Sequence, residues 1–159
     1  MTHPLTEMNI KQPIRSLVQR KFSSILNSPS IGAEEYRLNA LKSEYRADFA
    51  FQIKTGGWCF IEDDSHGTCL SNLLKYAAWI DENPPDGPVW IFHIISPKDS
   101  AWIRLCRKES ERLNKTINGF RHVIISTADW PEDSPPWLAE LEKEMEKMIK
   151  AGRLRISEG

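Results

Sequence analysis

The segment 89–95, VWIFHII, most constrains the fold, because it is apolar almost without interruption. A strand with one solvent-facing side alternates polar and apolar residues, whereas a strand covered on both faces does not. Pro97 ends this run, and a second run of the same kind occupies 120–126. The two runs predict central strands of a sheet that has helices packed against both of its faces.

Segments with helical periodicity precede, separate and follow these two runs. Apolar residues at helical spacing predict four helices. They cover 13–27 with Pro13 at the first position, 70–82, about 99–115 with Asp99 as N-terminal cap, and about 134–152, with Ser134 and Pro135 at the start and Gly152 as terminator. The segment 35–42 fits either a strand or a short helix, and both alternatives stay open.

The segment 45–64 predicts a β-hairpin. Its two halves, 45–54 and 58–64, alternate polar and apolar residues on either side of a turn at 55–57. This turn sets Lys54 opposite Trp58 and Asp48 opposite Asp64. We favour this register because it gathers the apolar side chains of both strands on one face, namely Phe49, Phe51, Ile53, Cys59 and Ile61.

Composition indicates one soluble domain over residues 1–159. Lys and Arg number 21 and Asp and Glu 22, so the net charge is -1 and no overall field attracts nucleic acid or anionic lipid. The sequence has no membrane-length apolar run and no signal-peptide pattern, so we expect a cytoplasmic protein without a membrane partner. Cys59, Cys69 and Cys106 form no CxxC pair and are expected to be reduced and structural.

Three carboxylates, of Asp48, Glu62 and Asp64, gather at one end of the predicted hairpin. Like charges so close destabilise a sheet, and a divalent cation held by hard oxygen ligands would account for them. The alternative, that the acids only solvate a strand end, stays open. The sequence favours no other site, because the zinc ligands around His66 are incomplete and no glycine-rich phosphate loop is present.

The first predicted helix is basic through Arg15, Arg20 and Lys21. These side chains could contact phosphate groups, and the alternative is an ordinary solvent-exposed helix face. The tryptophans within predicted helices and the apolar run are assigned to core packing, which applies to Trp79, Trp90 and Trp102.

Asp48, the hairpin, the acidic stretch at 61–64 and a helix with Asn72, Lys75 and Tyr76 together resemble the PD-(D/E)XK nuclease superfamily. The resemblance implies an α/β fold with a mixed central sheet flanked by helices. It would consist of a restriction-endonuclease-like αβββαβ core at about 13–97 and a C-terminal αβα extension at about 98–153.

The resemblance also implies roles for individual residues. Asp48 and Glu62 match the two acids that bind Mg²⁺ (or Mn²⁺). Asp64 stands where the family has lysine; some members have another acid there, which makes Asp64 a third expected ligand. Other members carry the lysine on the next helix, where Lys75 would orient the attacking water. Asn72 and Tyr76 have the spacing of the Gln-xxx-Tyr motif, which implies contact with substrate.

Besides Asp64 in place of lysine, Asn72 replaces the glutamine of the Gln-xxx-Tyr motif, and two further departures accompany this resemblance. Ala47 replaces the expected proline, and the first helix has no glutamate, which leaves Glu34, Glu35 or Glu44 as substitutes. The function implied is Mg²⁺-dependent hydrolysis of phosphodiesters in DNA or RNA. The alternatives are a catalytically inactive nuclease-like binding or protein-interaction module, and an interaction protein whose acidic hairpin is only solvated. A nucleic-acid partner is expected, and a homodimer remains open.

Overall fold

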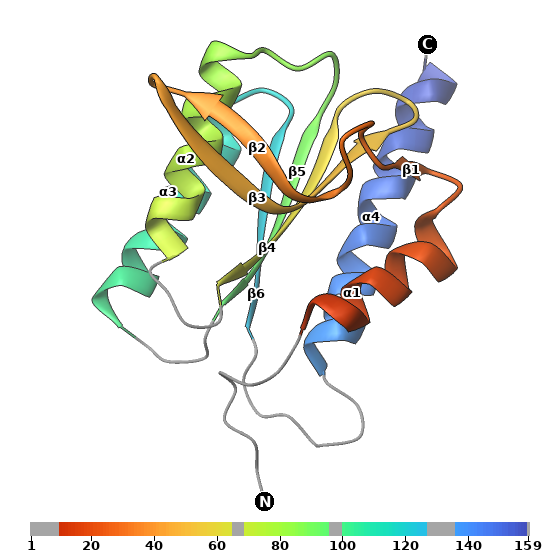
Figure 1. The fold of residues 1–159 in the computed structure, drawn as a ribbon, viewed down its shortest axis with the longest axis horizontal. Coiled ribbons are helices and arrows are strands. Elements are labelled where there is room, and N and C mark those ends of the chain that lie inside the picture. The colour runs from red at the N-terminus through yellow and green to blue at the C-terminus, as the bar shows by residue number, and fades with distance from the viewer. Residues whose placement is uncertain (1–9, 65–68, 96–99, 127–135, 159) are drawn as a thin grey trace, which may run out of the picture.

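A computed structural model describes residues 10–64, 69–95, 100–126 and 136–158 of the chain. It contains a curled mixed sheet of six strands with helices on both faces (Figure 1). In chain order the elements are α1 (Lys11–Leu17), the π-helical segment η2 (Val18–Phe22), β1 (Leu26–Asn27), β2 (Glu34–Ala40), β3 (Ser43–Ile53), β4 (Trp58–Asp64), α2 (Cys69–Glu82), β5 (Val89–Ile95), α3 (Ala101–Thr116), β6 (Phe120–Ser126) and α4 (Pro136–Glu158).

The sheet is antiparallel on one side and parallel on the other. β3 pairs antiparallel with β1, β2 and β4, whereas β4, β5 and β6 pair in parallel across connections that contain α2 and α3. The apolar runs form β5 and β6, but only β5 lies between two other described strands, and β6 ends the row. The prediction of a central position for 120–126 was therefore wrong, because an apolar run requires cover on both faces and not a neighbour at both edges.

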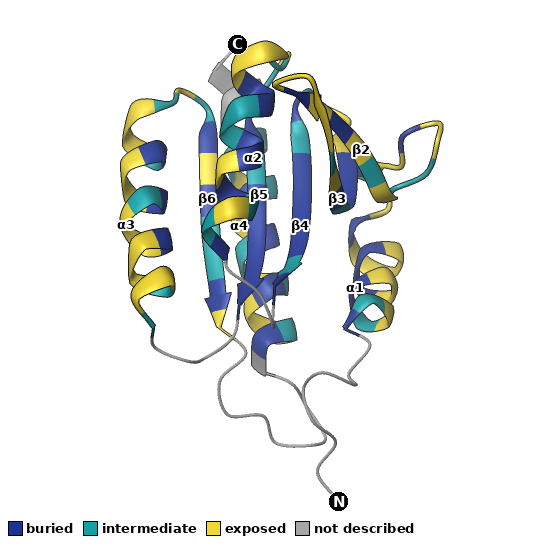
Figure 2. Ribbon diagram, turned by 60° about the vertical axis from the view of Figure 1, so that its left-hand side comes forward, coloured by how far each residue is buried: buried dark blue, intermediate teal, exposed yellow. Residues whose placement is uncertain are grey.

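Two hydrophobic layers hold the helices against the sheet. On one face, Phe92 packs with Ile14 of α1 and Leu141 of α4. On the other face, Ile91 packs with Leu73 of α2. Consecutive residues of β5 thus point into opposite layers, and Figure 2 shows α3 buried only along the side that faces the sheet. The predicted mixed α/β sheet with helices on both faces is confirmed.

β3 changes the layer into which it packs near Asp48. Ala47 is buried among the residues under α2, whereas Phe49 is buried among those under α1 and α4. The ladder with β4 runs only from Phe49 to Gln52 of β3, and the earlier part of β3 pairs with β2 instead. The sheet therefore curls at Asp48, and the β2–β3 hairpin crosses beside α2 (Figure 1).

The register of the β3–β4 hairpin differs from the prediction. Gln52, and not Lys54, pairs with Trp58, so Asp48 does not lie opposite Asp64. The pair that closes the turn moves by one residue on each strand, from Lys54 and Trp58 to Ile53 and Gly57. The partner of every residue therefore changes by two positions, which leaves each side chain on its predicted face. The predicted apolar face is accordingly present in the layer under α1 and α4, with Phe49, Phe51, Cys59 and Ile61 buried and Ile53 packed against them.

A contact with the next loop accounts for this register. The Ile53 N–H donates to the Gly57 carbonyl over 3.0 Å, which makes 54–56 the turn. Gly57 lies against the backbone of Pro88, and the Trp58 N–H donates to the Pro88 carbonyl over 2.9 Å. The start of β4 is thus positioned by the segment that leads into β5, a long-range contact that hairpin periodicity does not report.

The first helix is shorter than predicted. It ends at Phe22 after a π-helical segment, and β1 follows where the prediction continued the helix to Asn27. Leu26 pairs with Ile53 at the edge of β3 and is buried, so tertiary pairing overrides the helical spacing. The open alternative at 35–42 is resolved as a strand, β2.

Three further helix details differ from expectation. Ser100 caps α3 with its Oγ accepting from the Ile103 N–H over 3.2 Å, while Asp99, Ser134 and Pro135 lie outside the described residues. α4 continues past Gly152 to Glu158. Trp102 is 56% exposed and contributes little to the core, in contrast to Trp79.

Within the described ranges, no helix combines the length and the apolar character required to cross a membrane.

Gly57 and Gly32 allow a test of the contact at Pro88. Both have positive φ, 97° and 101°, but a Cβ on Gly57 would lie 2.0 Å from the Pro88 carbonyl oxygen and one on Gly32 would meet nothing within 4 Å. We expect Gly57→Ala to lower the free energy of unfolding by ~3 kcal/mol, and Gly32→Ala by only ~1 kcal/mol, since it adds backbone strain alone. Urea denaturation measures both; equal losses would contradict the packing of this turn against Pro88.

Candidate active site

The candidate site lies where β3 leaves β4. The last pair of their ladder joins Phe49 to Ile61, and the next positions along the two strands are Asp48 and Glu62. Side chains at opposed ladder positions have Cβ atoms about 5 Å apart. The Asp63 N–H donates to Oδ2 of Asp48 over 2.7 Å, which joins the two strands beyond the last ladder pair. The two principal acids of the sequence analysis therefore lie beside each other.

Glu62 is a buried carboxylate whose two oxygens are both bound by α2. The residue is only 3% exposed. Lys75 Nζ donates to Oε1 over 2.8 Å, and the Tyr76 hydroxyl donates to Oε2. A buried charge without partners costs several kcal/mol. These two hydrogen bonds therefore make it possible for a carboxylate to be buried at this position.

Lys75 joins α2 to both strands. Its Nζ also donates to the Arg46 carbonyl of β3 over 2.6 Å and to Oδ1 of Asn72 over 3.0 Å. The side chains of Lys75 and Tyr76 leave the helix about 100° apart, but the long lysine stem lets both reach Glu62. The structure thus brings Asn72, Lys75 and Tyr76 together with the two acids.

The electrostatics of this group favour a proton on Asp48. Burial, followed by the charge of Glu62, raises the pKa of Asp48 from 3.8 to about 7, while the Asp63 N–H and Lys11 oppose the rise. Burial and the same Glu62 charge also raise the pKa of Tyr76 well above its ordinary value, so the phenol stays protonated and donates. Asp48 is the group that can exchange a proton near neutral pH.

Asp64 faces a different set of partners. Its Oδ2 lies 3.3 Å from Nε2 of His93, whose Nδ1 lies 3.2 Å from Nε2 of His122. His122 in turn places its Nδ1 2.8 Å from the Ser110 hydroxyl on α3. The structure therefore places Asp64 in a buried polar chain that crosses β4, β5 and β6, with no hydrogen bond to Asp48 or Glu62 among the described residues.

The two histidines were not identified from the sequence. Each interrupts an apolar run, VWIFHII or FRHVIIS, and a polar residue within a buried strand requires a partner. Burial and the neighbouring His93 lower the pKa of His122 to about 3, so His122 is neutral under ordinary conditions. The interruption of both runs by histidine was the signal that could have indicated this chain.

The basic residues of the first helix lie apart from Glu62 and Lys75. Arg15 forms an ion pair of 2.6 Å with Glu34, and Lys21 one of 2.8 Å with Glu142 of α4. Arg20 is exposed on η2. None of the three has a described contact with the two acids. Of the glutamates considered as substitutes for a first-helix acid, Glu34 and Glu35 are engaged by cations of α1, and Glu44 lies on β3 near Arg37 and Arg46.

Asp48 and Glu62 are the residues of this site that could hold a divalent cation. Mg²⁺ keeps several water ligands and uses one or two carboxylates, so two acids are a sufficient donor set. Across the described residues, no three His, Cys, Asp or Glu side chains lie in an arrangement that could hold a metal ion. Any metal here would therefore depend on these two carboxylates together with water. Each oxygen of Glu62 accepts one hydrogen bond, from Lys75 or Tyr76, and a carboxylate oxygen has a second lone pair that could face a cation.

Comparison with known proteins gives no relative for this chain, since no protein-family model, no curated protein and no solved structure matches it.

The raised pKa of Asp48 predicts a pH-dependent stability. Between pH 4 and 7 the folded state holds a proton that the unfolded state has lost, so stability falls as pH rises through this window. We expect Asp48→Asn, which stays neutral, to be more stable than wild type at pH 8 by roughly 1–2 kcal/mol, after allowance for partial exposure, and to show no gain at pH 4. Urea denaturation at both pH values measures this.

The matched control is Asp81→Asn, an exposed acid of α2. It should change stability by the same small amount at both pH values, since surface charges contribute little. A gain for Asp48→Asn that does not grow with pH would mean that Asp48 is ionised in the folded protein at pH 4.

Proposed function

We propose that this protein is a Mg²⁺- or Mn²⁺-dependent phosphodiester hydrolase that acts on nucleic acid. The observation that carries the proposal is the arrangement at Glu62, with Asp48 at the next position across the ladder and Lys75 at 2.8 Å. Two acids that could hold a cation and one ammonium group that could position water or phosphate lie together where the strands diverge, which supports metal-assisted attack of water on a phosphodiester.

The fold supports a finer assignment as well. If the two-residue strand β1 is set aside, the order α1, β2, β3, β4, α2 and β5 would correspond to a restriction-endonuclease-like αβββαβ core, and α3, β6 and α4 to its αβα extension. Asp48 would correspond to the motif acid on the second strand of this order, and Glu62 to the acid on the third. Lys75 would correspond to the lysine that some members carry on the next helix. The assignment rests on this order and on these residues.

Each residue has a defined task in this proposal. A cation, when bound, would lower the pKa of a water ligand and neutralise charge that develops on the phosphate. Asp48 and Glu62 would hold it through carboxylate oxygens, and Lys75 would position water or phosphate with the N–H bonds that now bind Glu62. Tyr76 would keep Glu62 oriented through its hydroxyl. Asp48 must lose its proton first, so cation affinity is expected to rise with pH up to about 7.

A second candidate is a catalytically inactive module with the same fold. Both oxygens of Glu62 are already bound by Lys75 and Tyr76, which leaves this carboxylate without an obvious need for a cation. The net charge of -1 also provides no general attraction for a polyanion. A protein of this kind would bind its partner without cleaving it.

A cleavage screen separates the two functions. Labelled single- and double-stranded DNA and RNA are incubated with Mg²⁺ or Mn²⁺, and products are resolved on denaturing gels. We expect cleavage by wild type and at least a ~100-fold loss in Asp48→Asn, because a lost ligand removes stabilisation of transition-state charge. The control Glu111→Gln, an exposed acid of α3, should keep full activity. Full activity in Asp48→Asn would place the site elsewhere.

Lys75→Met provides the complementary test. An ammonium group positions water or phosphate and does not bind the cation, so we expect cleavage to fall by roughly 100-fold while Mn²⁺ affinity, measured by electron paramagnetic resonance, is retained. Circular dichroism must accompany the assay, since removing one partner of a buried pair destabilises the fold by about 3–5 kcal/mol. Parallel loss of Mn²⁺ binding and cleavage in a folded variant would contradict a role confined to positioning.

A further inference from the structure

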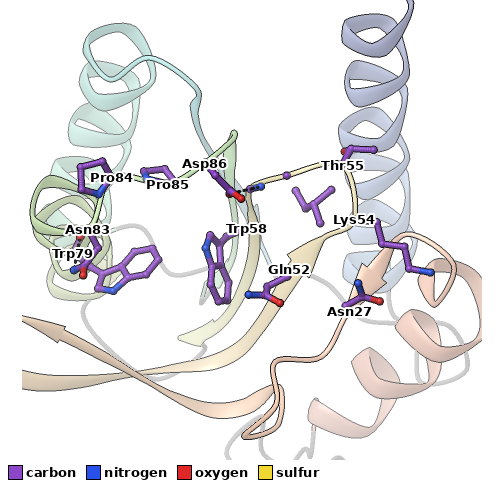
Figure 3. A pocket seen from close by; sticks show the side chains of 13 residues that line it. Asn27, Gln52, Lys54, Thr55, Trp58, Trp79, Asn83, Pro84, Pro85 and Asp86 are labelled. Carbon is purple, nitrogen blue, oxygen red and sulfur yellow. Dashed lines mark hydrogen bonds between the residues drawn. The ribbon is translucent and has the colours of Figure 1, made fainter.

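A pocket of about 750 Å³ opens at the end of the β3–β4 hairpin that lies away from Asp48 and Glu62 (Figure 3). Its walls come from the hairpin turn, the last turn of α2 and the loop at 83–86. Figure 3 shows the indoles of Trp58 and Trp79 and the amide of Gln52 around the same opening. The proposed phosphodiester chemistry uses none of these side chains.

Trp58 forms a rigid aromatic wall of this pocket. Its ring is stacked on Phe60 at 5.5 Å with planes 4° apart, and it meets Trp79 edge to face at 5.8 Å. Tyr36 of β2 contacts it at 5.3 Å. Trp58 nevertheless remains partly exposed, so the indole is fixed by the core and still offers surface to a ligand. A ring fixed in this way binds a planar ligand at little cost in side-chain entropy.

The polar groups of the pocket are mostly neutral. Asn27 and Gln52 have exposed amides that can both donate and accept hydrogen bonds, while Asn83 Nδ2 donates to the Trp79 carbonyl over 3.0 Å. Lys54 is the one cation among the lining residues, and the acid, Asp86, accepts from the Gly57 N–H over 3.1 Å. A phosphate-binding site would need several cations or free N–H groups. A stacking surface with amides around it fits a heterocyclic base, which has a π-face and both donors and acceptors at its edge.

The pocket walls are held by backbone contact. A Cβ on Gly57 would lie 2.0 Å from the Pro88 oxygen, and one on Gly87 would lie 2.6 Å from the backbone of Gly56. The hairpin turn and the loop that leads to β5 therefore touch along their main chains. No side chain has to move to open the pocket, which is consistent with a preformed binding site.

The pocket is connected to the candidate active site by both strands of the hairpin. Gln52 lies four residues after Asp48 on β3, and Trp58 lies four residues before Glu62 on β4. At ~3.3 Å per residue, the separation along the strands is about 13 Å. A stacked nucleic-acid strand, with a rise of ~3.4 Å per nucleotide, covers that distance in about four nucleotides.

We propose that this pocket binds an unpaired nucleobase of the substrate strand, stacked on Trp58 and contacted by Gln52. The inference rests on the proposed function, since the strand is the one whose phosphodiester would lie at Asp48 and Glu62. It names the substrate class more closely: nucleic acid with a single-stranded stretch a few nucleotides from the cleaved bond.

Binding without catalysis tests the pocket. Fluorescein-labelled hexathymidylate and an abasic hexamer of the same charge are titrated with full-length protein in EDTA, which prevents metal-dependent cleavage, and anisotropy is recorded. We expect the abasic hexamer to bind at least ~10-fold more weakly, because stacking of a base on an aromatic side chain accounts for about 5- to 100-fold in affinity. Gln52→Ala and Trp58→Leu should each weaken binding of hexathymidylate, the latter by about 10-fold or more.

Two controls make the result decisive. Trp102→Leu removes an exposed indole of α3 outside the pocket and should leave affinity unchanged. Gln52→Ala alters an exposed side chain and keeps the assay informative if Trp58→Leu does not fold. Absence of hexathymidylate binding, equal affinity for the abasic hexamer, or wild-type affinity in both folded pocket variants would overturn the pocket proposal.

These outcomes are independent of catalysis. Duplex cleavage by wild type that Asp48→Asn abolishes would leave the proposed function standing even if the pocket proposal fails. Conversely, base-dependent binding without cleavage by any metal would retain the pocket and favour the inactive module. Saccharides also stack on indoles, so maltohexaose is titrated in parallel. Saturable binding of maltohexaose that displaces hexathymidylate and is lost in Gln52→Ala would overturn the assignment to a base.

Discussion

The buried carboxylate of Glu62 is the constraint on which the arrangement around it depends. An ionised group with 3% exposure requires partners, and α2 supplies them through Lys75 and Tyr76. Lys75 simultaneously satisfies the Arg46 carbonyl, which has no ladder partner on β4. Lys75 therefore joins α2 to both strands at the point where β3 separates from β4, beside the hydrophobic layer that holds α2 against the sheet.

Periodicity predicted those parts of the fold that depend on which face is buried. β4, β5 and β6 have the predicted bounds because their sequence patterns show where a strand begins and ends, by alternation in β4 and by nearly continuous apolar character in β5 and β6. The predicted hairpin register was wrong, with the pair that closes the turn displaced by one residue on each strand. The register depends on the backbone contact between Gly57 and Pro88, which lie 31 positions apart in the sequence. The end of the first helix was wrong for a similar reason, since Leu26 pairs with a strand distant in sequence. Local patterns carry no information on such contacts.

The candidate site, like the fold, could be predicted in part from the sequence. Asp48 and Glu62 were identified from the hairpin pattern, Lys75 and Tyr76 from the resemblance to the nuclease superfamily, and the structure places the four side chains together. Asp64 has the same residue type and a similar spacing, but it bonds to His93 instead. The difference arises from the partner strand: β5 places a histidine beside β4 within an apolar run, and hydropathy averaged over that run conceals it.

The raised pKa of Asp48 connects the resting protein with the proposed chemistry. Lys75 balances Glu62, whereas among the described residues the Asp63 N–H and Lys11 only partly offset burial and the charge of Glu62 at Asp48, whose pKa rises to about 7. A proton removes this excess of negative charge, and a divalent cation would remove it as well. The two are therefore alternatives at the same oxygens. Under the proposed function, a cation at Asp48 would therefore take the place of this proton, and its binding would release a proton below about pH 7.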